Sequence, residues 1–373
     1  MNELATEAQP RQEGRPRRGS AHRRSGVGVT QRFGVVFVWM AIIVVFSIVR
    51  PDNFPTTSNF TTLFASQAPL GILSLALLIP LIAGDYDLSV ASVLALSSMM
   101  VAVLNVQYGW PVWGAAALAI AAGGFIGLVN GVLCVGADID PFIVTLGSGT
   151  FVGGIALWIS NSTPVSGVSP SLVNAVVVHR VFGLSLEFYY LIIIAVILWY
   201  FFDFTPPGRR ALMVGKGREV ARLSGLRVKR IRIFSFIGAG LLSGLAGVVY
   251  VGTSGSADPS AGTTLLLPAF AAVFLGSTTL YPGRFNPWGT LVAVYFLTTG
   301  INGLALLGVS TFVQQLFYGG ALVIAVLLSS VTVRTRGRRL RRERVSEIYD
   351  RPSGSPVTVE PTVDGQRSAT SDQ

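Results

Sequence analysis

The sequence predicts an all-α membrane protein, a polytopic bundle of about ten transmembrane helices. The 373 residues are 51% hydrophobic and only 12% charged, whereas soluble domains carry roughly 25% charged residues. The apolar residues gather in repeated runs of about 20, the length that an α-helix needs to cross the hydrocarbon layer. A third feature, an internal repeat with an offset near 171 residues, predicts that two halves of the bundle have opposite orientations.

Ten apolar runs of suitable length can be placed along the chain. They cover residues 33–49, 64–83, 88–106, 112–135, 141–159, 185–203, 232–251, 264–280, 286–306 and 311–331. The second and third runs are separated only by Gly84-Asp-Tyr-Asp87, so this break is expected to lie within the membrane or at its edge. The predicted transmembrane domain of the chain is therefore residues 33–331. The flanking segments, 1–32 and 332–373, are rich in polar residues and are expected to be disordered tails.

Basic residues are concentrated in three places outside the apolar runs. Seven arginines precede residue 33, nine basic residues lie between Arg209 and Arg232, and seven arginines lie between Arg334 and Arg344. Positive charge beside membrane spans marks the cytoplasmic side. All three clusters agree with one topology, in which both termini and the loop after the sixth span are cytoplasmic. Nucleic acid is not an expected partner, because no aromatic-interleaved basic domain lies outside the spans.

Short segments recur in the same order at a nearly constant offset. Asp87-Leu-Ser-Val-Ala-Ser92 resembles Asp258-Pro-Ser-Ala-Gly-Thr263, Asn130-Gly131 resembles Asn302-Gly303, and Phe142-Ile143 resembles Phe312-Val313. The offset carries spans two to five onto spans seven to ten, and an odd shift of five spans inverts the second copy. Inverted repeats are common in transporters, whose pathway lies at the repeat interface. The candidate pathway or repeat-interface residues are Asp85, Asp87, Ser89, Asn130, Phe142, Asp258, Ser260, Asn302 and Phe312.

Most of these side chains also have a simpler structural interpretation. Asp87 can cap a helix by accepting a hydrogen bond from the amide of Ser89 or of the next residue. Asp258 precedes a proline, and this pair is common in turns. Asn130 and Asn302 can form hydrogen bonds between helices inside apolar spans. For the acids, capping, lining of a hydrated pathway and proton coupling all stay open, because a carboxylate in hydrocarbon needs water, a partner or a cavity.

The sequence contains no set of residues typical of catalysis or metal binding. The histidines, His22 and His179, lie in a tail and in a predicted external loop, and the single cysteine, Cys134, lies in an apolar run. No pair of His or Cys has metal-ligand spacing, and no Gly-x-x-x-x-Gly-Lys-Ser/Thr loop is present. We therefore expect no enzyme activity and no bound cofactor in this chain. The internal repeat favours transport over a merely structural role in the membrane.

The loop over residues 208–230 is the longest polar interval inside the apolar sequence, and its middle is predicted to form a short helix. Glu219, Arg222 and Leu223 share one face of that helix, and Gly225 can end it in a left-handed conformation. A basic loop can bind anionic lipid headgroups, but this one offers only a narrow apolar face. The other interpretation is a docking element that fits a groove in a soluble partner.

Six blocks of sequence carry a family resemblance. They are Ala83-Gly-Asp-Tyr-Asp-Leu-Ser-Val-Ala-Ser-Val-Leu94, Asn130-Gly131 with 139–147 and 164–167, Ala221-Arg-Leu-Ser-Gly-Leu226, residues 255–262, residues 276–280 with Gly283-Arg284, and Leu307-Gly-Val-Ser310. In this order they resemble blocks of the membrane permeases of ribose/galactose/xylose-type ABC sugar importers, over nearly all of residues 33–331. The chain departs from the family pattern at Asp85-Tyr86, where Gly-Ile is commoner, and at Ala91, where Gly is commoner.

The resemblance implies a permease subunit that imports a pentose or hexose across a bacterial cytoplasmic membrane by alternating access. It implies separate ATPase subunits that bind ATP and Mg, a second permease copy in a homodimer or heterodimer, and an extracytoplasmic sugar-binding protein. The loop resembles the Glu-Ala-Ala…Gly coupling segment of ABC importers, which maps onto Glu219, Ala221 and Gly225, with Arg222 and Leu223 between them.

Other functions remain open at this point. A related ABC permease for branched-chain amino acids, nucleosides or a signalling sugar would share the same blocks. A secondary transporter driven by protons or sodium would also contain inverted repeats, although it should place essential carboxylates in the middle of its spans. A membrane scaffold that transports nothing is the third alternative, and the repeat argues against it.

Overall fold

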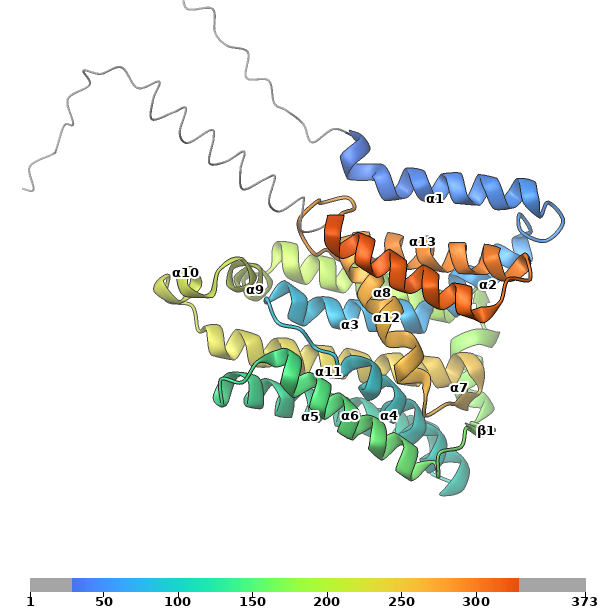
Figure 1. Cartoon of the computed structure of the whole chain (residues 1–373). Coiled ribbons are helices and arrows are strands. Elements are labelled where there is room, and N and C mark those ends of the chain that lie inside the picture. Colours follow the sequence, from blue (N-terminus) through green and yellow to red (C-terminus); the bar gives the residue numbers. More distant parts are fainter. Residues whose placement is uncertain (1–28, 329–373) are drawn as a thin grey trace, which may run out of the picture.

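The computed structural model describes residues 29–328, which form a bundle of helices (Figure 1). The predicted tails, 1–32 and 332–373, lie outside the described residues apart from 29–32, which belong to the first helix. Strands in the described part are only two residues long, in agreement with the predicted all-α class. β1 pairs with β4 and β2 pairs with β3, both antiparallel.

The elements follow one another in three groups. The first group is α1 (Val29–Val49), α2 (Thr57–Ser66), α3 (Ala68–Ile82), α4 (Val90–Ala102), η1 (Val103–Gln107), α5 (Val112–Gly136) and α6 (Pro141–Ile159). The second is β1 (Val165–Ser166), α7 (Pro170–Val173), η2 (Asn174–Val178), β2 (Arg180–Val181), β3 (Leu184–Ser185), α8 (Leu186–Phe204), α9 (Pro206–Lys216) and α10 (Arg218–Leu223). The third is α11 (Val228–Ser254), β4 (Ser256–Ala257), α12 (Ala261–Gly276), α13 (Pro287–Leu306) and the last helix, Thr311–Leu328.

Eight helical segments among residues 29–328 are long and apolar enough to cross a membrane. They are Thr57–Ile82, Val90–Gln107, α5, α6, α8, α11, α13 and the last helix. Two more apolar helices, Phe33–Val49 of α1 and the whole of α12, are shorter. The ten predicted spans therefore correspond to ten helical segments among the described residues. The chain is a multi-pass membrane protein.

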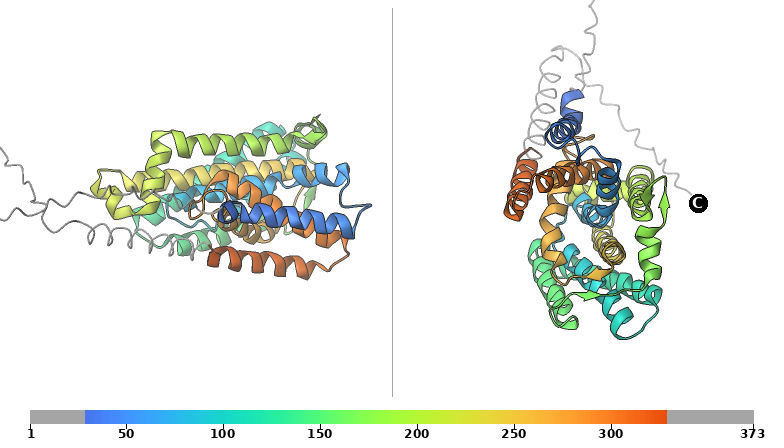
Figure 2. Two further views of the ribbon diagram at one scale, coloured as in Figure 1. Left: turned by 90° about the horizontal axis from the view of Figure 1, so that it is seen from above. Right: turned by 90° about the vertical axis from the view of Figure 1, so that its right-hand side faces the viewer.

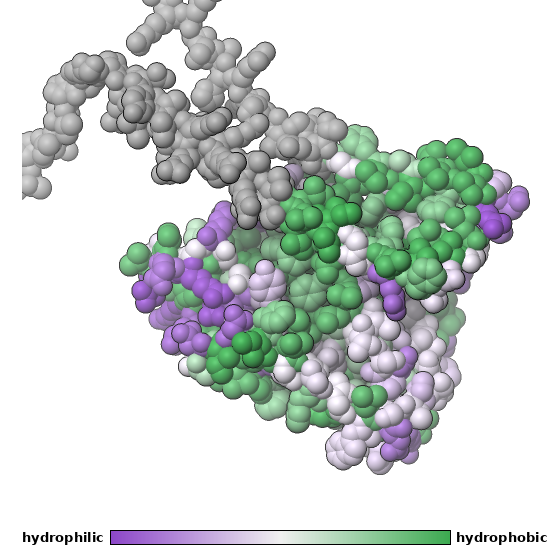
Figure 3. Space-filling model, in the orientation of Figure 1, coloured by the Kyte–Doolittle hydropathy of each residue, from purple (hydrophilic) through white to green (hydrophobic). Residues whose placement is uncertain are grey.

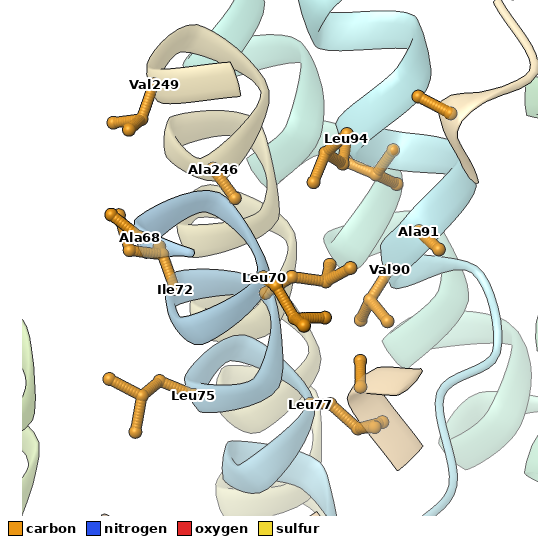
Figure 4. Packing of buried hydrophobic residues seen from close by; sticks show 14 of the residues in the cluster. Ala68, Leu70, Ile72, Leu75, Leu77, Val90, Ala91, Leu94, Ala246 and Val249 are labelled. Carbon is orange, nitrogen blue, oxygen red and sulfur yellow. The ribbon is translucent and has the colours of Figure 1, made fainter. Parts of the chain in front are cut away.

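The centre of the bundle is formed by α3, α4 and α11. Leucine and isoleucine side chains of α3, such as Leu70, Ile72 and Leu77, are buried against these neighbours (Figure 4). α3 is buried along nearly its whole length, whereas most apolar side chains of α6, α8 and the last helix are partly or fully exposed. Seen along the bundle, α1 and the last helix lie on the side opposite α5 and α6 (Figure 2, right).

One end of the bundle is hydrophilic and basic. Figure 3 shows hydrophilic residues gathered over α9 and α10, while apolar residues cover much of the helical flank. We call this end, which carries nine basic residues between Arg209 and Arg232, the basic end. α3 runs toward the basic end, and α11 runs away from it (Figure 1). Because the offset of the repeat carries α3 onto the second part of α11, the two copies have opposite directions, as the inverted repeat predicts.

Glycines allow α5 and α11 to pack with their backbones in close contact. A Cβ atom on Gly123 would lie 2.4 Å from the carbonyl oxygen of Gly240, and one on Gly127 would lie 2.3 Å from that of Phe236. Real Cβ atoms do not approach oxygen this closely. Small residues stabilise such contacts because lipid gives no hydrophobic drive for helices to associate. The glycines of these spans therefore serve packing.

We predict that Gly127→Ala destabilises the bundle, because the new methyl group forces α5 away from α11. Overpacking of this kind costs about 1–3 kcal/mol. Gly114→Ala is the matched control, since this glycine also lies in α5 but a Cβ atom added to it would meet nothing within 4 Å. Thermal unfolding in detergent should show a lower midpoint for Gly127→Ala and an unchanged or higher midpoint for Gly114→Ala. Equal midpoints for the two variants would contradict the close packing.

Candidate functional site

The helical path is interrupted between α3 and α4, as the sequence predicted, and the interruption contains a buried polar network. One carboxylate oxygen of Asp87 accepts from the amide of Ser89 at 2.9 Å and from its hydroxyl at 2.6 Å. The hydroxyl oxygen of Ser89 accepts in turn from the amide nitrogen of Asn130 in α5, at 2.9 Å. All three side chains are buried. The structure thus brings together three of the predicted site residues.

Two further features define this first break, residues 83–89. The amide of Leu88 donates to the hydroxyl of Thr145 in α6 at 3.0 Å, so α6 also holds the segment. The Asp87 side chain is only 1% exposed, so its hydrogen bonds from Ser89 replace contacts with water. The hydrogen bond from the Ser89 amide is the one expected of a capping carboxylate.

A second break, residues 255–260, precedes α12 and has the same local geometry. One carboxylate oxygen of Asp258 accepts from the amide of Ser260 at 2.8 Å and from its hydroxyl at 2.6 Å. Ser89 and Ser260 are the residues immediately before α4 and α12, and both have helical backbone angles. The Asp-x-Ser turn therefore recurs in three dimensions at the two positions that the repeat relates. Unlike Asp87 and Ser89, this second pair is partly exposed.

The two interrupted helices meet close to their first residues. A Cβ atom on Gly262 would lie 2.7 Å from the carbonyl oxygen of Ala91, so the backbones touch. Ala91 and Gly262 are themselves related by the repeat offset of 171. Contact between equivalent positions is what a pseudo-two-fold axis produces. The interface of the two repeats therefore passes between α4 and α12, and the Asp-x-Ser turns lie on either side of it.

The remaining candidate pathway residues do not join this cluster. The amide nitrogen of Asn302 in α13 donates to the side-chain oxygen of Asn59 in α2 at 2.8 Å, so Asn302 forms an interhelical hydrogen bond with a different partner from Asn130. Phe142 and Phe312 are exposed in the first turns of α6 and of the last helix. Contact of any of these residues with a solute stays a prediction.

At the basic end, the loop after α8 forms two helices, α9 and α10. α10 corresponds to the short helix predicted in the middle of the loop. Glu219 and Arg222 pair on its exposed face at 2.8 Å, while Ala221 is buried toward the bundle. The side chain of Leu223 projects into the surroundings with 83% of its surface exposed. Gly225 has a φ of 77°, so it ends the helix in the left-handed conformation that the sequence indicated.

Asp85 binds two arginines that sequence analysis did not connect with it. The guanidinium of Arg232 in α11 donates to both carboxylate oxygens at 2.8 Å each. Arg218, the first residue of α10, donates to the same carboxylate at 2.7 Å and also to the carbonyl oxygen of Gly84 at 2.7 Å. Asp85 is only 1% exposed. The extra carboxylate noted in the sequence is therefore neutralised by side chains from the loop and from α11.

Comparisons with known proteins agree with this architecture. The family described as branched-chain amino acid transport system/permease component matches residues 59–326, which include both breaks and the α9–α10 loop. The chain belongs to this permease family. The permease is 35% identical to the ribose import permease protein of Bacillus subtilis over 306 residues, which are 81% of this chain and 93% of the relative.

Other relatives of the permease are similar in extent. It is 34% identical to the L-arabinose ABC transporter permease protein of Azospirillum brasilense over 308 residues, 82% of this chain and 90% of the relative. It is 31% identical to the D-allose transport system permease protein of Escherichia coli over 297 residues, 80% of this chain and 91% of the relative. No solved structure gives a significant match. The resemblance to permeases of ABC sugar importers is thereby confirmed.

We predict that Asp85→Asn lowers the stability of the permease. The change leaves the Arg232 guanidinium, 9% exposed, without a charged partner. Removing one partner of a buried ion pair costs about 3–5 kcal/mol. Arg222→Gln is the control, because its exposed pair with Glu219 contributes only about 0–1 kcal/mol. Thermal unfolding in detergent should separate the two variants, and an unchanged midpoint for Asp85→Asn would contradict the buried pairing.

Proposed function

We propose that the permease imports a monosaccharide, a pentose or a hexose, across a bacterial cytoplasmic membrane as the transmembrane subunit of an ATP-driven importer. The observation that carries the proposal is the pair of interrupted helices that meet at Ala91 and Gly262 across an inverted repeat. Relatives named for ribose, D-allose and L-arabinose support a monosaccharide as the solute.

The mechanism is alternating access between the two repeats. Interrupted helices leave backbone groups near the membrane interior that a passing polar solute can meet. ATP closes a dimer of separate ATPase subunits, which bind the nucleotide and Mg, and α10 moves with them. The repeats then rock about the crossing of α4 and α12, which opens the pathway first to one side and then to the other.

The basic end faces the cytoplasm in this proposal. Its nine basic residues between Arg209 and Arg232 follow the rule that positive charge stays inside. α10 is a short helix with an exposed face and an exposed Leu223 at its end, and this face docks into a groove of the ATPase subunit. A second permease copy completes the membrane part, and an extracytoplasmic sugar-binding protein delivers the solute at the opposite end.

A second solute class is kept because the matching family is described by branched-chain amino acid transport. A relative with 28% identity is named as an autoinducer 2 import permease, which adds a third kind of solute. Ligand screening of the cognate binding protein separates these cases. Binding of a pentose or hexose supports the proposal, and selective binding of an amino acid overturns the monosaccharide part of it.

We predict that affinity purification of the permease from mild detergent recovers an ATPase subunit. Its rate of ATP hydrolysis should rise when the sugar-loaded binding protein is added, because loading signals that a solute is ready for import. The control is the same binding protein without sugar. Recovery of the permease alone, together with uptake into vesicles that needs an ion gradient and no ATP, would instead support a secondary transporter.

We predict that Glu219→Ala and Gly225→Pro each abolish uptake without preventing membrane insertion. Glu219 pairs with Arg222 on the exposed face of α10. Proline cannot adopt the positive φ of Gly225, and it also removes the amide that donates to the carbonyl of Arg222 at 3.0 Å. Arg230→Gln, a change at an exposed arginine outside α10, is the control. Normal ATP-dependent uptake in both the Glu219 and the Gly225 variant would exclude α10 as the coupling element.

A further inference from the structure

The first break is in direct contact with the α9–α10 loop through backbone as well as side chains. A Cβ atom on Gly215 in α9 would lie 2.0 Å from the carbonyl oxygen of Ile82, the last residue of α3. A Cβ atom on Gly84 would lie 3.4 Å from the Cα atom of Gly215. The backbone of α9 therefore packs directly against the end of α3 and the start of the first break, with no room for a side chain between them.

Asp85 connects this point to two different elements. Arg232 belongs to α11 at the centre of the bundle, and its side chain is almost completely buried. Arg218 belongs to α10, and its side chain is 43% exposed at the basic end. Because Arg218 also binds the carbonyl oxygen of Gly84, it holds both the backbone and the side chain of the first break. The buried pair anchors the break, and the exposed pair attaches it to the loop.

The path from this attachment to the repeat interface is short and contains no regular helix before residue 90. Asp85 is followed by the capping pair Asp87 and Ser89, and then by Ala91 at the contact with Gly262. A displacement of the Gly84–Asp85 backbone therefore acts on the start of α4 directly. Because the buried backbone groups at this helix start need partners from the protein itself, the cap formed by Asp87 and Ser89 moves with the start of α4.

The second break is attached differently. The repeat offset places Ser256 at the position equivalent to Asp85, and Ser256 lies in β4, which pairs with Ser166 of β1. The two breaks are therefore tied to different parts of the protein, the first by charged side chains to α10 and the second by a short strand pair to the segment after α6. Among the described residues, the ionic attachment belongs to the first break.

We propose that Arg218 is a positioning residue that transmits movement of α10 to the start of α4 through its contacts with Asp85 and Gly84. The inference rests on the proposed function, in which an ATPase subunit moves α10. A purely structural role would make Arg218 important for folding alone. Transmission instead requires that its loss leaves the fold and the complex intact, because Asp85 still has Arg232, but separates the first break from the nucleotide state.

The experiment follows the first break directly in the complete complex. The reporter is Tyr86→Cys in a Cys134→Ala background, because Cys134 is the single cysteine of the chain and Tyr86 lies in the break with 47% of its surface exposed. The permease is co-purified with its ATPase subunit and placed in lipid nanodiscs. The rate of maleimide labelling at residue 86 is then measured without nucleotide and after trapping with ATP and vanadate.

The parent protein is the Tyr86→Cys, Cys134→Ala permease. Trapping should change its rate of labelling at residue 86 at least fivefold. Arg218→Gln should reduce that change to less than twofold, while recovery of the ATPase subunit and the thermal midpoint stay those of the parent. Arg218→Lys, which keeps the charge, should restore part of the change. Arg230→Gln, the matched exposed arginine, should respond like the parent.

The outcomes separate the inference from the function on which it rests. A full nucleotide response in Arg218→Gln overturns the inference, and so does a parent whose labelling rate does not change on trapping. A lower thermal midpoint together with loss of the ATPase subunit in Arg218→Gln assigns the residue a folding role and also overturns it. If the parent recovers no ATPase subunit at all, the proposed function itself fails.

Discussion

Two helices of the permease start inside the bundle, and the polar groups at each start need partners from the protein itself. Both starts meet this requirement in the same way. In each, one carboxylate oxygen of an aspartate accepts hydrogen bonds from the amide and from the hydroxyl of the serine two residues later. This turn allows α4 and α12 to begin at the repeat interface, where Ala91 and Gly262 touch. The packing of α3, α5 and α11 surrounds a crossing that would be costly without these caps.

The two halves differ in how the cap is supported. Around the first break, Asn130 of α5 and Thr145 of α6 add hydrogen bonds, and the network is buried. Around the second break, Asp258 and Ser260 are partly exposed. An inverted repeat needs equal folds in its two copies but not equal surroundings. The buried copy faces the end of the bundle that carries α10, so the more tightly held break is the one nearest the α9–α10 loop.

The sequence predicted those parts of the fold that depend on local patterns. The spans follow from apolar length, the break at 83–89 from its charges, and the end of α10 from Gly225, each of which is visible within a few residues. The partners of Asp85 were not predicted, because Arg218 and Arg232 lie 133 and 147 residues away and follow no periodic pattern. Repeat symmetry also gave no indication that Asn302 would bind Asn59 of α2, because Asn130, its equivalent in the first copy, binds Ser89 instead.

The buried carboxylate of Asp85 is accommodated by its partners in the structure. A carboxylate that is removed from water has to be neutralised by groups of the protein. The two arginines reach it because α10 and α11 both pass the first break. The basic loop therefore has contacts directed toward the bundle as well as its exposed positive charge. Since Arg232 suffices to neutralise one carboxylate, the contact of Arg218 is better explained by attachment of the loop to the break than by charge balance.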